Sequence, residues 1–336
     1  MPKRATPSTI HDVAKAAGVS VATVSRVLNR PHRVRESTRR HVQAVIHSLN
    51  YRPNETARNL STGRTLSISV AMPFMARDSF VERLRGIEAT SSVNAYDLVM
   101  SNIESVVRRN SYYESLFDGR RFDGVVIATL RPSDEEAAQL ANGAMPVVLL
   151  DTSHPLLSSV DCDDVEGGRL AAHHLIERGH RRLAFLGDTE FGFNFVSARE
   201  RLSGFVEVLN DAGLALGSRD EWWIVHSSHA ARTLLSPILD RPAAERPTAI
   251  FATSDLTALA LLDGMERLGL KAPDDLAVIG YDDLHGARWK ALTTIRQPLF
   301  QSGVSAIELL LSQMGGGNTS PQQTLLPLEL IIREST

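Results

Sequence analysis

The stretch TIHDVAKAAGVSVATVSRVLN, residues 9–29, predicts a helix, a short turn and a second helix. Thr9 is placed to cap the first helix, because Asp12 follows three residues later and can reach back to the cap. Gly18 suits the left-handed backbone of the turn, and Ser20 is placed to cap the second helix. Two helices joined by a four-residue turn with glycine are typical of the helix-turn-helix motif.

A third helix is predicted over residues 37–49, because apolar side chains recur there on one helical face. Val42, which lies on that face, would help to close a three-helix core around Val13, Val24 and Val27. The first fifty residues therefore contain enough apolar positions for a small helical domain.

The charge of the chain is distributed unevenly. Residues 1–65 contain 12 Lys and Arg against 3 Asp and Glu, a net charge of +9. The remaining residues contain 24 against 36, a net charge of −12, so the total of −3 conceals the asymmetry. A polycationic segment indicates a nucleic-acid or anionic-membrane partner, or else a solvated charged face. The helix-turn-helix pattern in the same segment favours double-stranded DNA.

In a helix-turn-helix unit the second helix lies in the major groove, with its first residues against the base edges. Val21 and Ala22 are placed to contact thymine methyl groups. Arg26 is placed to donate two hydrogen bonds to guanine, with a phosphate contact as the alternative. Other side chains are expected at phosphates, which position the domain without specifying a sequence: Thr23, Ser25, Asn29, Arg30, Arg33 and Arg35.

A second motif, NYRPNETARNL at residues 50–60, follows the third helix. Its proline ends that helix, and Asn54 can then cap a short helix with Ala57 and Leu60 on one side. Together with the helix-turn-helix stretch at residues 9–29, this motif resembles the lac repressor family of bacterial transcription regulators.

The resemblance implies a hinge helix within residues 53–65 that folds on operator DNA and pairs with its twin in a dimer. Leu60 would insert into a minor-groove base step and bend the duplex, and Asn54, Ala57 and Arg58 would also bind DNA. An isolated helix this short is marginal in water, so it needs docking to persist. An ordinary linker with a buried Leu60 is the alternative.

From Thr65 onward, short β-rich runs alternate with amphipathic helices. Strands are expected at residues 66–72, 96–100, 124–128, 146–150, 182–186, 248–252 and 276–280, and helices at residues 80–93 and 165–178. Such βαβ repeats favour an α/β fold of doubly wound parallel sheets covered by helices on both faces. The resemblance, which extends from Thr9 to about Arg333, implies a two-lobed core like that of a periplasmic sugar-binding protein.

The predicted organisation has three parts. A helix-turn-helix DNA-binding domain spans residues 1–52, and a hinge helix and linker span residues 53–65. An effector-binding and dimerisation domain spans residues 66–336. Its N-lobe comprises about residues 66–162 and 297–325, and its C-lobe about residues 163–296 and 326–336.

Ligands of open α/β sheets bind beyond the carboxyl ends of the strands. Asp151, Ser254 and Asp282 follow predicted strands. Arg201 lies at the start of a helix that follows the predicted strand at residues 182–186. The resemblance assigns Arg201, Ser254 and Asp282 to the effector. A guanidinium facing a carboxylate suits vicinal hydroxyl groups, which predicts a sugar-like effector. The alternatives are a helix cap for Asp282, a turn residue for Ser254, and an Arg201–Asp282 ion pair.

The effector is expected to bind in a cleft between the two lobes, and Arg77, Ser79 and Phe80 are predicted to line the N-lobe side of that cleft. The resemblance also places His226 near a position where family members stack a ring on the ligand. Leu299 stands where family members often have an aromatic ring, which removes one stacking surface for a sugar. The charge of Arg77 leaves an acidic or phosphorylated sugar open. Asp255 and Asp283, which also follow predicted strands, are expected to be structural caps rather than ligand contacts.

Several function classes find no support in the sequence. Cys162 is the single cysteine, so an intrachain disulfide or an all-cysteine metal site is excluded. We expect no cofactor or enzyme activity, because the nucleophile-elbow, phosphate-loop, dinucleotide-binding and zinc-protease motifs are absent. The apolar content of 43% argues against disorder.

The cellular setting is also predicted from the sequence. A secretory leader and a long apolar run are absent, so we expect a cytoplasmic protein. No heptad repeat follows Arg333, so a homodimer is expected rather than a coiled-coil tetramer. The alternative from a different class is a solute-binding protein of a transport system, which the basic N-terminal domain argues against.

Overall fold

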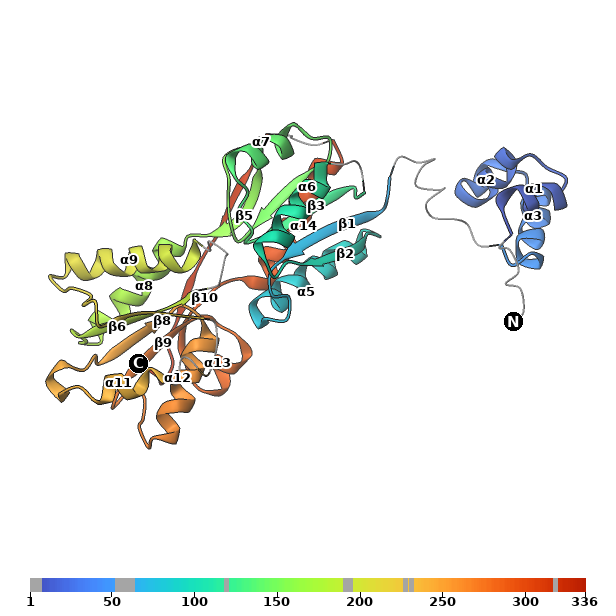
Figure 1. The fold of residues 1–336 in the computed structure, drawn as a ribbon. Coiled ribbons are helices and arrows are strands. Elements are labelled where there is room, and N and C mark those ends of the chain that lie inside the picture. The colour runs from blue at the N-terminus through green and yellow to red at the C-terminus, as the bar shows by residue number, and fades with distance from the viewer. Residues whose placement is uncertain are drawn as a thin grey trace. The chain divides into compact units, whose positions relative to one another are not determined.

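The computed structural model describes residues 8–51, 64–117, 121–189, 196–225, 229, 233–316 and 320–336. The chain divides into two compact units, residues 1–65 and residues 66–336 (Figure 1). None of the described helices is long and apolar enough to cross a membrane.

The first unit is a three-helix domain. Its helices are α1 (Ile10–Ala16), α2 (Val21–Asn29) and α3 (Glu36–Ser48), with the short 3₁₀ helix η1 (Pro31–Arg33) before α3. Thr9 and Ser20 cap α1 and α2 as predicted, and the Thr9 backbone N–H donates to Asp12 Oδ2 over 2.8 Å. Gly18 has the expected positive φ of 63°. The apolar core between the helices is formed by Val13, Ala14, Ala17, Val24, Val27 and Val42.

Within the described residues, the second unit contains two six-stranded sheets. The strands of the N-lobe sheet are β1 (Ser67–Met72), β2 (Asp97–Asn102), β3 (Gly124–Ala128), β4 (Val147–Leu150), β5 (Ser158–Cys162) and β11 (Gln323–Leu326). They lie in the order β11-β5-β4-β3-β1-β2, and all neighbours are parallel. One face packs on α5 (Asp78–Val93) and α14 (Leu299–Met314), and the other on α6 (Val106–Phe117) and α7 (Asp134–Asn142).

The C-lobe repeats this plan. Its strands are β6 (Leu183–Thr189), β7 (Glu221–Val225), β8 (Ala249–Ala252), β9 (Ala277–Asp282), β10 (Thr293–Arg296) and β12 (Glu329–Ile331). The order is β12-β10-β9-β8-β6-β7, and the edge strand β12 runs antiparallel to β10. One face is covered by α8 (Asp164–Glu177) and α9 (Ser197–Asp211). The other is covered by α11 (Leu235–Leu239), α12 (Asp255–Arg267) and α13 (His285–Trp289), with η2 (Ala243–Glu245) preceding β8.

The chain passes between the lobes after β5, after β10 and after β11, so the sheets share three connections among the described residues (Figure 1). The predicted α/β class with doubly wound parallel sheets is confirmed. Each strand predicted from the sequence is present, within a few residues. Sequence analysis did not predict β5, β7, β10, β11 and β12, which are short or carry polar residues.

Candidate functional site

One face of α2 is exposed, and the opposite face is buried in the helical core. Val24 and Val27 are buried, whereas Ala22, Arg26 and Asn29 are exposed at a spacing of four and three residues. Side chains at this spacing lie on one face of a helix. Three of the residues predicted to contact DNA, Ala22, Arg26 and Asn29, therefore lie on one exposed face of α2.

Local hydrogen bonds hold the polar side chains of this surface. Ser20 Oγ accepts from the backbone N–H of Thr23 over 3.2 Å, and Asn29 Nδ2 donates to Ser25 Oγ over 3.3 Å. Arg26 Nε donates to a backbone carbonyl one turn earlier over 3.2 Å. The guanidinium nitrogens beyond Nε make no hydrogen bond to a described residue, so they are available to a partner.

The other residues predicted to bind DNA fall into two groups. Val21 begins α2, Thr9 caps α1, and Arg33 is exposed in η1. The hinge residues Asn54, Ala57, Arg58 and Leu60 lie outside the described residues.

A cavity in the second unit is lined by residues of both lobes. Seven of the eight residues that were predicted to bind the effector line this cavity. The eighth, His226, lies outside the described residues. The lining residues are Arg77, Ser79, Phe80, Arg83, Thr129, Asp151, Asp188, Ser197, Ala198, Arg201, Thr253, Ser254, Asp282 and Gln297. The cavity thus lies at the carboxyl ends of strands from both sheets, which is where open α/β sheets bind their ligands.

The N-lobe side of the cavity contains a buried ion pair. Arg83, on α5, pairs with Asp151, which follows β4, through Nη2. The same nitrogen donates to Gln297 Oε1 over 3.0 Å. Gln297 lies where the chain passes from β10 in the C-lobe to α14 in the N-lobe, so this network joins the lobes.

The C-lobe side contains a matching ion pair. Arg201 Nε donates to Asp164 Oδ1 over 2.8 Å, and Nη1 donates to the Thr253 carbonyl over 2.7 Å. The guanidinium lies 3.6 Å from the ring centroid of Tyr281, whose hydroxyl donates to the same Asp164 oxygen over 2.8 Å. Burial opposes the charge of Arg201, but the nearby acidic groups raise its pKa above the ordinary value. The partner of Arg201 is thus Asp164, and not Asp282 as the alternative had it.

A Cβ atom at Gly167 would overlap the Tyr281 hydroxyl. Gly167 thus leaves room for the hydroxyl that binds Asp164, and the packing of α8 on β9 depends on it. This is a local requirement of the C-lobe ion pair that a side chain at the same position would break.

Asp282 ends β9 with a φ of 119° and accepts a hydrogen bond from Gln297 Nε2 over 2.6 Å. Burial raises the pKa of Asp282, while Arg201 and Arg83 oppose that rise. The cap of α13 is Leu284, so Asp282 is not a helix cap. Ser254 does cap α12, by accepting from the Thr257 backbone N–H, and it lines the cavity as well.

Arg77 lies at the start of α5, with its guanidinium 4.2 Å from the ring centroid of Phe74. Burial lowers the pKa of Arg77 to about 10, and the charge of Asp188 from the C-lobe opposes that fall. Arg77 remains charged at neutral pH, so the N-lobe lip presents a cation to the C-lobe.

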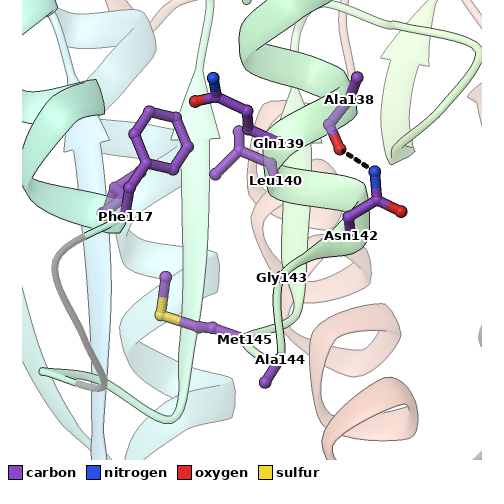
Figure 2. A pocket seen from close by; sticks show the side chains of 9 residues that line it. Phe117, Ala138, Gln139, Leu140, Asn142, Gly143, Ala144 and Met145 are labelled. Atoms are coloured by element: carbon purple, nitrogen blue, oxygen red, sulfur yellow. Dashed lines mark hydrogen bonds between the residues drawn. The ribbon is translucent and has the colours of Figure 1, made fainter.

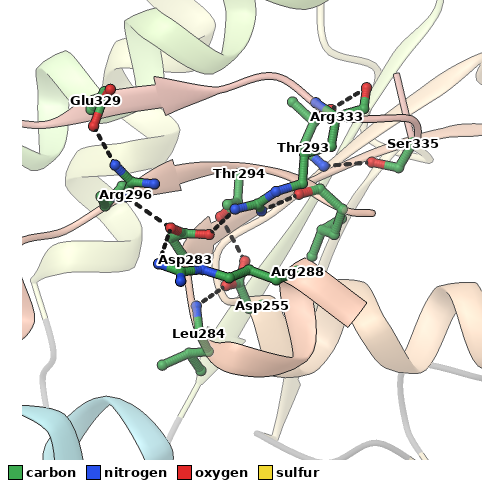
Figure 3. A network of polar contacts seen from close by, with 11 residues as sticks. Asp255, Asp283, Leu284, Arg288, Thr293, Thr294, Arg296, Glu329, Arg333 and Ser335 are labelled. Atoms are coloured by element: carbon green, nitrogen blue, oxygen red, sulfur yellow. Dashed lines mark hydrogen bonds and ion pairs between the residues drawn. The ribbon is translucent and has the colours of Figure 1, made fainter. Parts of the chain in front are cut away.

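The carboxylates next to the cavity are tied into the scaffold (Figure 3). Asp255 is fully buried and accepts from the Leu284 N–H over 2.7 Å and from Thr294 Oγ1 over 2.6 Å. Asp283 pairs with Arg296 over 2.8 Å, Arg333 over 2.5 Å and Arg288 over 3.7 Å. The prediction that Asp255 and Asp283 are helix caps is wrong, because Ser254 caps α12 and Leu284 caps α13. Their contacts are nevertheless structural, since they brace loops and strands.

Three of the residues that were not predicted from the sequence, Arg83, Asp164 and Gln297, form the ion pairs and amide contacts at the cavity. Arg83 shares a helical face with the buried Phe80 and Ile87, and a charge on that apolar face was a signal for it. Asp164 and Gln297 carry no comparable signal in the local sequence pattern. Nothing in the sequence alone indicated that they would meet Arg201 and Arg83.

A second cavity lies in the N-lobe, between the ends of α6 and α7 (Figure 2). Leu116, Phe117, Leu140 and Met145 give it a mainly apolar lining, and Gln139 and Asn142 add amide groups. It holds no ionisable side chain among its described lining residues. Nor is any group of three His, Cys, Asp or Glu in the described parts of the chain arranged to hold a metal ion.

Comparison with known proteins agrees with this architecture. Residues 9–54 match the model of bacterial regulatory proteins of the lacI family, and residues 172–336 match a periplasmic binding protein-like domain. The HTH-type transcriptional regulator DegA of Bacillus subtilis (strain 168) is 32% identical over 340 residues, covering 98% of each chain. The chain belongs to the lacI family of bacterial regulatory proteins.

Solved structures of lacI-family regulators show the same fold over the whole chain. The lac repressor dimer bound to operator and the anti-inducer ONPF has a TM-score of 0.84 and 29% identity, over 98% of this chain and 99% of that one. The transcriptional regulator CelR in complex with cellobiose has a TM-score of 0.71 and 29% identity, over 98% and 100%. The chain is thus a lacI-family transcription regulator with a DNA-binding head and a ligand-binding core.

Proposed function

We propose that this lacI-family regulator is a homodimeric repressor that binds a pseudo-palindromic operator and responds to a sugar or sugar derivative between its lobes. The observation that carries the proposal is the cavity at the meeting strand ends, where Arg201, Asp282, Asp151 and Ser254 present charged and polar groups from both lobes. A ligand there touches both lobes, so it can favour one angle between them.

The lining favours a polyol. Hydroxyl groups donate and accept at once, and the cavity offers guanidinium donors beside carboxylate acceptors. Phe80 and the methylene groups of the arginines add apolar surface for a sugar ring. Leu299 provides no stacking ring, so polar contacts would dominate recognition. The CelR structure, with cellobiose bound to a similar chain, supports a carbohydrate.

A homodimer is supported by apolar side chains that the N-lobe leaves exposed at one edge. The edge strand β2 exposes Val99 and Met100, and α6 exposes Val106 and Val107, the last at 77%. Edge strands with exposed apolar side chains tend to be covered. The related lac repressor is a dimer on its operator. Two-fold symmetry would place the two DNA-binding units on operator half-sites that lie about one helical turn apart.

Effector and operator are proposed to be coupled through the lobe angle, which decides whether the twin hinge segments can fold on DNA. Such coupling is reciprocal and typically amounts to about 1–3 kcal/mol per site. The cavity is proposed to bind rather than react, because its arginines and carboxylates are engaged in ion pairs and amide contacts instead of a nucleophile and base.

Fluorescence anisotropy tests the function. The full-length protein is titrated with a library of pseudo-palindromic duplexes, with bulk competitor DNA present. A specific duplex bound at least about tenfold more tightly than competitor is expected; equal affinity for all duplexes refutes the proposal, and it would favour the solute-binding alternative.

The effector is then identified by mass spectrometry of ligand retained from the expression host. Calorimetry measures its affinity for free protein and for operator-bound protein. Equal affinities in the two states would refute the allosteric part of the proposal while leaving DNA binding intact.

A further inference from the structure

Gln297 lies in one of the connections between the lobes and is buried, with 5% of the residue exposed. It follows β10 of the C-lobe directly and precedes Pro298, which caps α14 of the N-lobe. Its backbone is held on both sides, because β10 pairs with β9 before it and the proline after it restricts it to extended conformations. A side chain fixed at this point can contact both lobes.

The side-chain amide of Gln297 makes one hydrogen bond to each lobe. Oε1 accepts from Arg83 Nη2 of α5 over 3.0 Å, and Nε2 donates to Asp282 Oδ1 at the end of β9 over 2.6 Å. The same Arg83 nitrogen also pairs with Asp151 of the N-lobe. Four side chains are therefore joined in series, and we call the central part, Arg83–Gln297–Asp282, the amide bridge.

The order of donors and acceptors in the amide bridge requires an amide at its centre. A guanidinium has donors only, and an ionised carboxylate has acceptors only. A side chain between them must accept at one end and donate at the other, which the neutral amide of Gln297 does. Arg83 is 3% exposed and Asp282 is 7% exposed, so a side chain that failed to pair with them would leave buried polar groups unsatisfied.

The amide bridge also determines how Asp282 faces the effector cavity. Gln297 binds one of the two oxygens of this carboxylate, and among the described residues the other oxygen accepts no hydrogen bond. Asp282 lines the cavity, so its second oxygen is left for a donor group of a ligand. The bond from Gln297 therefore fixes the position of the oxygen that would meet the effector.

We propose that Gln297 is a positioning residue of the effector cavity: its amide holds Asp282 of the C-lobe and Arg83 of the N-lobe together, and thereby holds the lobes in one arrangement. The role of Asp282 toward the effector rests on the proposed function, whereas the amide bridge itself does not. A ligand that changes the lobe angle has to work against this bridge.

A side chain that only fills space would behave differently from a bridge. Glutamate has nearly the shape of glutamine, so Gln297→Glu keeps the packing but replaces the donor that faces Asp282 by a second carboxylate oxygen, and the two like charges repel. Asp282→Asn then supplies a donor from the other side. In the double variant the new carboxylate accepts from Arg83 and from the new amide, so the bridge is restored with the net charge of the wild type.

The first measurement is thermal unfolding of the full-length protein at about pH 8, which disfavours a proton shared by two carboxylates. The midpoint of Gln297→Glu is expected to fall by at least about 4 °C, because repulsion replaces a buried hydrogen bond. Adding Asp282→Asn is expected to restore at least about half of that loss. A wild-type midpoint for Gln297→Glu, or a loss that Asp282→Asn leaves unchanged, would overturn the bridge.

Two further variants complete this experiment. Gln297→Met is similar in length but offers neither a donor nor an acceptor, so its midpoint should also fall, and a wild-type midpoint would contradict the bridge. Gln301→Glu is the matched control, because Gln301 is exposed on α14 and should keep the wild-type midpoint. If Gln297→Glu does not fold, the double variant decides: a folded protein supports the bridge, and an unfolded one overturns it.

The second measurement is the rate at which Ellman's reagent labels Cys162, the single cysteine of the chain. Cys162 ends β5, where the chain passes between the lobes, and lines a small cavity together with Arg83 and Gln297. Burial raises the pKa of this thiol to about 12, so labelling of the wild type should be slow. Loss of the bridge should loosen this region and speed labelling at least about fivefold in Gln297→Glu.

The double variant is expected to return the labelling rate toward that of the wild type, and Gln301→Glu should not change it. If the unfolding midpoints follow the expected pattern but all labelling rates coincide, the bridge stands and its hold on the lobes is overturned. Neither measurement uses operator or effector, so a failure here is distinguishable from a failure of the proposed function.

Discussion

Asp282 and Asp283 are neighbours in the chain, yet they lie in two very different regions. Asp283 has a side chain that is 2% exposed and pairs with three arginines in the network of Figure 3. Asp282 accepts one amide hydrogen bond, lines the cavity, and has a pKa raised by burial. The backbone at both residues has a positive φ, 119° at Asp282 and 57° at Asp283.

The difference teaches how to distinguish a structural carboxylate from a candidate binding carboxylate. A buried carboxylate whose oxygens are fully paired stabilises the fold, because removing it leaves buried cations without a partner. A buried carboxylate with spare acceptor capacity costs stability unless a ligand supplies donors. By this criterion Asp283 and Asp255 belong to the scaffold, and Asp282 belongs to the proposed site.

Asp283→Ala should have the largest effect. It leaves the half-buried guanidinium of Arg333 without its partner and frees Arg296, so the unfolding free energy of the core should fall by about 3–5 kcal/mol. Chemical denaturation measures the loss. A loss no greater than that of Asp282→Ala would break the comparison between the two residues.

Asp255→Ala should come next. The variant removes the acceptor of the Leu284 N–H and of the Thr294 hydroxyl, both buried, at a cost of about 2–3 kcal/mol. Burial and the charge of Asp282 raise the pKa of Asp255 well above its usual range, so a neutral amide should substitute well. Asp255→Asn is therefore expected to lose less than Asp255→Ala in the same denaturation experiment.

Asp282→Ala should affect the effector response rather than the stability of the core. The effector response should disappear, which removes a coupling of about 1–3 kcal/mol, while operator affinity stays near normal. The change in operator affinity on addition of the retained ligand, followed by anisotropy, measures this response. A surviving response would show that the cavity around Asp282 is not the effector site.

Arg26→Ala tests the DNA-binding unit, where the side chain of Arg26 is exposed on α2. We expect a loss of about 1–3 kcal/mol in discrimination at one base pair of each half-site, with the stability of the core unchanged. Affinities for single-base-pair operator variants test it. A uniform loss over all sequences would make Arg26 a phosphate contact.

The fold followed from the sequence where periodicity was strong. The caps Thr9 and Ser20 mark helix starts, because their side chains satisfy free backbone N–H groups whatever the tertiary context. The apolar runs of β1, β3 and β4 predicted buried parallel strands. By contrast, β11 alternates between exposed and half-buried residues at a sheet edge, so its pairing with β5 comes from the tertiary fold rather than from local pattern.

The candidate site was predictable only in part. Strand ends identified Asp151, Ser254 and Asp282, since ligand sites in open sheets lie there. The partners that fix them could not be found in this way: Gln297 meets Arg83 across 214 residues of sequence, and Arg201 meets Asp164 across 37. Contacts of this kind depend on how the lobes pack, and a single sequence does not record that.

The interleaved path of the core has a consequence for how the protein is made. β11 completes the N-lobe sheet and β12 the C-lobe sheet, and both follow α14 in the chain. A ribosome must therefore deliver nearly the whole polypeptide before either lobe can close, although the DNA-binding unit could finish folding hundreds of residues earlier. During synthesis the DNA-binding unit would be folded while both lobes of the core are still incomplete. Apolar surface of the core is exposed at this stage, so the nascent chain then has the greatest need of chaperones.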